Sequence, residues 1–70
     1  MEEKKITIKV ARTMAGLTQR ELAEKLGVSR MAVWAWEKGE NIPRLDYALK
    51  LCELADIPIT ALLLPSEAQK

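Results

Sequence analysis

The 70-residue sequence has no histidine, one cysteine and no long apolar run, and each absence excludes a class of function. Without histidine, the chain lacks the commonest general base and the commonest zinc ligand. A single cysteine forms neither an internal disulfide nor a thiolate metal cluster. No apolar run in the sequence approaches the roughly 20 residues that span a bilayer. Residues 1–5 begin no signal peptide, so we expect a cytoplasmic protein with no membrane segment.

The remaining side chains show no nucleophile–base pair, no metal-ligand set and no phosphate-binding loop. We therefore expect no enzyme, no metal, no cofactor and no small-molecule ligand. The 11 Lys and Arg against 10 Asp and Glu give a net charge of +1, which excludes a polybasic coat but not a locally basic face. The length allows one small domain, which needs efficient helix packing or a partner subunit to be stable.

Three glycines and three prolines divide the chain into segments whose apolar residues recur at helical spacing. No strand-like alternation extends beyond Ile6–Ile8. The pattern predicts an all-α, compact five-helix domain over residues 6–64, between a flexible N-terminal arm (1–5) and a C-terminal tail (65–70). The predicted helices cover about 6–15, 18–26, 29–38, 45–56 and 59–64.

The second and third predicted helices are joined by a tight turn. Thr18 and Glu21 have the spacing of a capping box, which satisfies free N–H groups in the first helical turn. Gly27 supplies a left-handed C-terminal conformation, and Ser29 caps the next helix at once. A turn of about three residues that contains glycine is typical of a helix-turn-helix. The spacing alone is equally compatible with an ordinary αα-hairpin in a bundle.

The third predicted helix has two unlike faces. One face is assigned to the core and consists of Ala32, Val33 and Trp36. The other face carries Arg30, Met31, Trp34 and Ala35. A cation beside large apolar groups suits the DNA major groove, where arginine bonds guanine and apolar groups pack on the thymine methyl. A protein interface anchored on Met31 and Trp34 is the alternative.

Many positions in one continuous register then match a known pattern. They are Arg12, Gly16–Gln19, Glu21–Ala23, Leu26–Ser29, Val33, Trp36–Glu37 and Gly39, followed by Pro43, Leu45, Leu49–Leu51 and Leu62. The sequence resembles the lambda-repressor-like, Cro/CI-type (XRE family) helix-turn-helix domain over residues 6–64. The resemblance implies five helices, a homodimer and operator DNA as the partner, with the third helix in the major groove.

The resemblance also implies residue roles. The positions that match base contacts are Arg30, Met31, Trp34 and Ala35. Those that match phosphate contacts are Thr18, Gln19, Ser29, Lys38, Asn41 and Arg44. Arg12 and Glu37 match a structural ion pair that links the first helix to the end of the third. Glu40 would repel a phosphate, and Asp56 replaces the glycine usual at the end of the fourth helix.

The C-terminal part carries more apolar side chains than one helix can bury. In the fourth helix, the core stripe is assigned to Leu45, Ala48, Leu49, Cys52 and Ala55. Because no histidine can activate Cys52, we interpret it as a small core residue. The family places its dimer contact near the fifth helix, so the predicted dimer interface consists of Ile57, Ile59, Leu63 and Leu64.

Charge is divided unevenly along the chain. Residues 1–39 hold eight Lys and Arg and five Glu, a net +3, whereas residues 45–70 hold two Lys and four acidic residues, a net −2. Glu40 and Arg44 cancel, which gives the total of +1.

We predict a sequence-specific DNA-binding transcriptional regulator, most simply a repressor, that binds a pseudo-palindromic operator as a homodimer. The alternative is an antitoxin-like or adaptor module of the same fold that binds DNA weakly or not at all.

Overall fold

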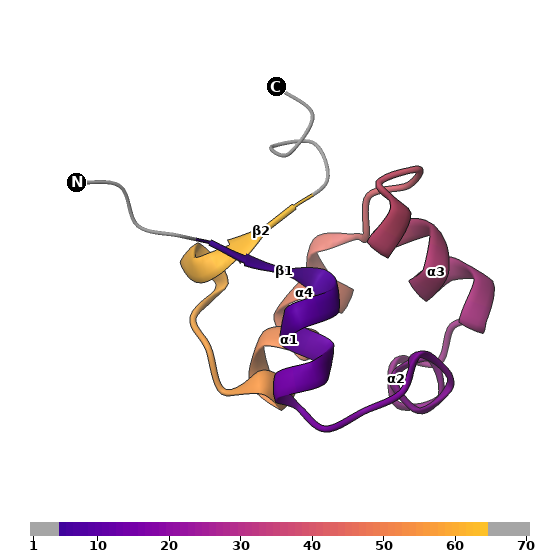
Figure 1. Ribbon diagram of the computed structural model, residues 1–70, viewed down its shortest axis with the longest axis horizontal. Helices are drawn as coiled ribbons and strands as arrows, with labels where there is room; N and C mark the ends of the chain where they lie inside the picture. The colour runs from indigo at the N-terminus through magenta and orange to yellow at the C-terminus, as the bar shows by residue number, and fades with distance from the viewer. Residues whose placement is uncertain (1–4, 65–70) are drawn as a thin grey trace.

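A computed structural model describes residues 5–64 of the chain (Figure 1). The predicted tail and all but Lys5 of the predicted arm lie outside these described residues. Within them, the α-helices are α1 (Ile8–Met14), α2 (Gln19–Leu26), α3 (Arg30–Lys38) and α4 (Leu45–Ala55). A 3₁₀ turn, η1 (Ile59–Ala61), follows α4. Two short strands, β1 (Ile6–Thr7) and β2 (Leu62–Leu63), pair in parallel.

The prediction of a compact, mostly helical domain is confirmed, but the prediction of a fifth α-helix was wrong. Residues 59–61 make only one 3₁₀ turn, because the chain then pairs with β1 instead of continuing a helix. Ile6 lies opposite Leu62, and the side chain of Leu62 is buried in the core. The β-branched Ile6 and Thr7 favour this extended conformation. Helix α1 therefore begins at Ile8, after an N-cap in which Thr7 accepts a hydrogen bond from the Val10 N–H.

The core joins all four α-helices to β2. Helix α2 packs on α3 and α4, and α1 packs on α4, α3 and both strands. Leu22 and Val33 are the largest fully buried side chains. Trp36 is also buried and lies against Tyr47, with ring centroids 5.8 Å apart. The predicted core face of α3 is thus confirmed for Val33 and Trp36, while Ala32 is only partly buried.

The predicted core stripe of α4 was wrong in its rotation. Ala48, Cys52 and Ala55 are buried as expected, but the large buried side chain beside them is Leu51. The other residues assigned to this stripe, Leu45 and Leu49, are 64% and 42% exposed. Leucines occur on several sides of this helix, so their spacing could not select the face that meets α1.

Cys52 is a buried free thiol, as the sequence interpretation expected. Burial raises the pKa of this thiol, because the interior disfavours the charged thiolate. The side chain is therefore protonated at neutral pH and contributes to packing. In the part of the chain that the structure describes, no helix is long and apolar enough to cross a membrane.

Candidate nucleic-acid interface

Local capping determines where α3 begins relative to α2. The Thr18 hydroxyl accepts the Glu21 N–H at 3.1 Å, and the Glu21 carboxylate accepts the Thr18 N–H at 2.9 Å. Gly27 ends α2 at φ 76°, in the left-handed region that a side chain disfavours. Ser29 then accepts the Ala32 N–H at 3.1 Å and caps α3. The helix-turn-helix predicted from these residues is confirmed.

A polar network lies behind α3. The Arg12 Nε donates to Glu37 Oε2 at 2.6 Å, and the two side chains are only 14% and 7% exposed. Arg12 also donates through Nη1 to the Leu17 carbonyl at 2.9 Å. The predicted Arg12–Glu37 pair is therefore present and ties α1 to the last turn of α3. Because both charges are largely desolvated, either one alone would be costly.

Gln19 extends this network to the solvent-facing side of α3. Its amide nitrogen donates to Glu37 Oε1 at 3.0 Å, and its amide oxygen accepts from Arg30 Nη1 at 3.4 Å. Gln19 thus bridges a buried carboxylate and an exposed guanidinium. The sequence assigned Gln19 to a phosphate and missed this bridge. The bridge depends on the crossing of α2 and α3, which brings residue 19 beside residues 30 and 37.

The outer side of α3 has an exposed cation and an exposed apolar side chain at its start. Arg30 is exposed, and Met31 has 60% of its surface in solvent. Trp34 is half-buried, and the Lys38 ammonium lies 5.8 Å from the centre of its ring. Arg30, Met31 and Trp34 can therefore reach a partner along one side of the helix.

Ala35 corrects the predicted base-contacting set. It is only 8% exposed, so its side chain offers almost no surface to a base edge. The chain after α3 folds back over this position, where the Ala35 carbonyl accepts the N–H groups of Glu40 and Asn41 at 2.9 and 3.4 Å. An alanine is small enough for either side of a helix, so the sequence could not place it.

Most of the predicted phosphate donors lie on the surface. In Thr18 and Ser29 the cap uses an acceptor lone pair of the hydroxyl, which leaves the hydroxyl hydrogen to donate. Lys38 and Asn41 are exposed. Arg44 is exposed as well, 3.3 Å from Asp46 and over a tyrosine ring. Such an exposed ion pair is weak, so Arg44 can exchange Asp46 for a phosphate at little cost.

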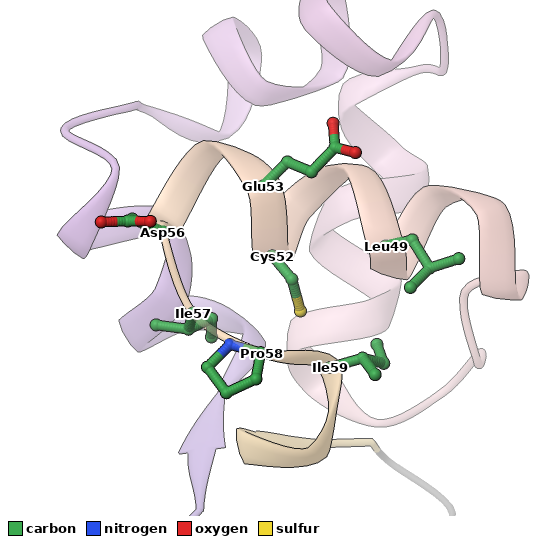
Figure 2. A pocket seen from close by; sticks show the side chains of 7 residues that line it. All are labelled: Leu49, Cys52, Glu53, Asp56, Ile57, Pro58 and Ile59. Carbon is green, nitrogen blue, oxygen red and sulfur yellow. The ribbon is translucent and has the colours of Figure 1, made fainter.

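A second surface lies on the side of α4 that carries Leu49. A hollow of about 570 Å³ opens there, and Figure 2 shows its lining. The lining residues are Leu49, Cys52, Glu53, Asp56, Ile57, Pro58 and Ile59. Of the four predicted dimer residues, Ile57 and Ile59 line this hollow, whereas Leu63 and Leu64 do not; all four are half-buried. The exposed apolar residues Ile42, Leu45 and Leu49 were missed as surface candidates.

A family model described as helix-turn-helix matches residues 8–62 of the chain. This match spans all four α-helices and reaches into β2. The chain belongs to the XRE-type helix-turn-helix family. The resemblance seen in the sequence is therefore confirmed, and the family is one of DNA-binding transcriptional regulators.

Curated relatives agree with this assignment. An uncharacterised HTH-type transcriptional regulator of Methanocaldococcus jannaschii is 42% identical over 52 residues, 74% of this chain and 79% of that protein. The phage transcriptional repressor RstR of Vibrio cholerae is 35% identical over 60 residues, 86% of this chain and 54% of RstR. A much longer HTH-type regulatory protein of Pyrococcus furiosus is 48% identical over 44 residues, which are 63% of this chain and only 14% of that protein.

Proposed function

We propose that this chain is a sequence-specific DNA-binding transcriptional regulator that inserts residues 29–38 into the major groove. The observation that carries the proposal is Arg30, an exposed guanidinium at the start of α3 that the Gln19–Glu37–Arg12 network holds against the body of the domain. A positioned arginine loses little conformational freedom when it binds a base. The chain works by binding and contributes no catalytic step.

Two of the outward residues of α3, Arg30 and Met31, read the groove in this proposal. Arg30 donates to guanine O6 and N7, and Met31 packs on a thymine methyl group. Trp34 lies one turn further along, where the helix leaves the groove. The hydroxyls of Thr18 and Ser29, together with the amide of Asn41, donate to phosphates and orient the domain. Direct hydrogen bonding to bases is therefore concentrated at one base pair in each half-site.

We propose that two copies bind a pseudo-palindromic operator, with their recognition helices about 34 Å apart. The hollow beside Leu49, with Ile57 and Ile59 in its lining, supports a two-fold contact there. Leu45 and Ile42 add further exposed apolar surface. Leu63 and Leu64 stay in the proposed interface; both are half-buried and lie outside the lining of the hollow.

We propose repression as the regulatory outcome. RstR, a relative that aligns with 86% of this chain, is a repressor by name. A compact domain that occupies a promoter excludes polymerase without needing any further activity. An operator that overlaps the promoter supports this direction, and an operator upstream that raises transcription contradicts it.

Selection of bound duplexes from a random pool tests DNA recognition. The expected result is a symmetric site whose half-site contains a guanine read by Arg30. Arg30→Ala should then relax the preference at that base pair, which corresponds to about 1–3 kcal/mol of discrimination. Arg20→Ala is the matched control, because Arg20 is exposed on α2 and has no assigned contact. Equal weakening of every sequence by Arg30→Ala would exclude base reading by this residue.

Sedimentation tests the dimer separately from DNA. Leu49→Glu should keep the fold, because the side chain is already 42% exposed, and should shift the protein toward monomer. Met14→Glu is the control, since Met14 is 53% exposed and lies outside the hollow. A wild-type chain that stays monomeric on its selected duplex would contradict the proposed dimer.

The exposed apolar surface of Met31 supports a second candidate, a protein-interaction module with weak or no DNA binding. The same selection separates the two functions. Failure of the wild-type chain to retain any duplex at low salt would favour the module.

A further inference from the structure

The part of the chain that the structure describes holds two methionines, and both are exposed. Met14 has 53% and Met31 has 60% of its surface in solvent. Met14 ends α1, whereas Met31 lies in the first turn of α3, directly after Arg30. A methionine sulfur in solvent can be oxidised to a sulfoxide. An oxidant therefore reaches two methionines on different surfaces, and Met31 belongs to the proposed DNA face.

Cys52 is the other sulfur-containing residue within residues 5–64, and it is far less accessible. It is 3% exposed, and burial raises the pKa of its thiol, so the reactive thiolate is scarce at neutral pH. It lies on α4, in the lining of the hollow beside Leu49. Oxidation at mildly acidic pH, where the thiol stays protonated, therefore acts on the methionine sulfurs.

Oxidation of Met31 changes the chemistry that α3 presents to a base edge. In the reduced form, the unbranched and polarisable side chain is an apolar partner for a thymine methyl group. The sulfoxide is polar and carries an oxygen that accepts hydrogen bonds and donates none. Thymine presents its own acceptor, O4, beside the methyl group. The oxidised side chain therefore loses an apolar contact and brings two acceptors face to face.

We propose that Met31 is a redox-sensitive modification site at which a peroxide weakens DNA binding. This inference rests on the proposed function and adds a means of regulating it. A sulfur lone pair attacks one peroxide oxygen, so that the S–O bond forms while the O–O bond breaks. The sulfur loses two electrons, and the second oxygen leaves as hydroxide and takes the proton of the first to form water. A methionine sulfoxide reductase, with a dithiol as reductant, returns the sulfoxide to the sulfide.

The placement of α3 does not depend on the Met31 side chain. Ser29 caps the helix through the Ala32 N–H. Arg30 is bonded to Gln19. With 60% of Met31 in solvent, an added oxygen enters water and displaces no core side chain. Oxidation therefore changes the reading surface while the domain stays folded, and DNA that covers Met31 should slow its oxidation.

Mild oxidation with hydrogen peroxide, followed by binding to the selected duplex, tests the site. Met31→Leu and Met14→Leu are matched variants, because each removes one exposed sulfur and keeps the other. Each oxidised protein is compared with its own reduced form, and mass spectrometry verifies which sulfurs carry oxygen. For each subunit, oxidation should weaken binding by about fourfold or more, the equivalent of one lost methyl contact, in the wild-type chain and in Met14→Leu. Oxidation should leave the affinity of Met31→Leu unchanged.

Duplexes in which one thymine is replaced by uracil, which lacks the methyl group, locate the contact. The reduced wild-type chain should lose affinity at one position in each half-site, and the oxidised chain should bind thymine and uracil equally there. Treatment with the reductase should restore the affinity and the preference for thymine. Thermal unfolding should be the same before and after oxidation.

Three results would overturn the modification site and leave the proposed function intact. They are equal sensitivity of Met31→Leu and the wild-type chain, an oxidised wild-type chain that binds as tightly as the reduced one, and loss of the folded state on oxidation. A reduced wild-type chain that binds no duplex would instead overturn the proposed function, and this inference with it.

Discussion

The two halves of this domain differ in how their helices begin and end. In the helix-turn-helix half, α2 and α3 both have side-chain N-caps, and a glycine ends α2. In the C-terminal half, α4 and η1 begin without a side-chain cap. Helix α4 ends at Asp56 with φ 59°, the one residue other than glycine at positive φ within residues 5–64. Leucines on α4 also remain in solvent.

The difference shows where the sequence constrains geometry most. Around α3, the N-caps, the turn and the Arg12–Glu37 ion pair all favour the same placement of the helix. Around α4, apolar surface and a disfavoured backbone conformation remain. The proposed dimer contact lies on this part of the surface.

The comparison with the largest expected effect takes one leucine from each half of the domain. Leu22→Ala removes a fully buried side chain and should lower the free energy of unfolding by roughly 2–5 kcal/mol. Leu49→Ala removes a side chain that is 42% exposed and should cost less than about 1 kcal/mol. Denaturant unfolding at low protein concentration measures both values without a contribution from self-association. Similar losses would mean that Leu49 is part of the monomer core.

The next comparison concerns two ion pairs. Glu37→Ala leaves the guanidinium of Arg12 desolvated and should cost about 3 kcal/mol. Asp46→Ala breaks an exposed pair, whose side chains are 76% and 59% accessible, and should change stability much less. Thermal unfolding of both variants provides the measurement. A small loss in Glu37→Ala would show that water compensates Arg12.

The comparison with the smallest expected effects takes the C-cap residues of two helices, and the two effects should have opposite signs. Gly27→Ala should destabilise the domain by about 1 kcal/mol through backbone strain alone, since an added Cβ at Gly27 meets no atom within 4 Å. Asp56→Gly should stabilise it by up to about 1 kcal/mol, because glycine adopts positive φ without that penalty. Chemical denaturation resolves both changes. A loss of stability in Asp56→Gly would indicate that the aspartate side chain contributes to the native state.

Much of the helix-turn-helix half could be predicted from the sequence because the caps and the turn that form it involve residues close together in the chain. The Thr18–Glu21 box, the turn at Gly27 and the Ser29 cap each depend on residues a few positions apart. The Arg12–Glu37 pair is not local, and only the family pattern pointed to it. Ala35 was misplaced because its side chain is too small to favour either side of α3.

The C-terminal half could not be predicted in the same way. Two-residue strands have no periodicity, and β1 forms only because β2 arrives from the other end of the chain. The buried side of α4 depends on contact with α1, which the scattered leucines do not encode. The bridge from Gln19 to Arg30 depends likewise on how α2 and α3 cross.

The parallel pairing of β1 with β2 brings both ends of the described chain to one place. Figure 1 shows this junction on the side of the domain away from α3. A fold that begins and ends at one point can be joined to another polypeptide as a unit, with little disturbance to its interior. The alignment to 14% of a much longer regulatory protein fits this modular use. A polypeptide joined at either end of the described chain would therefore leave the domain on the side away from α3.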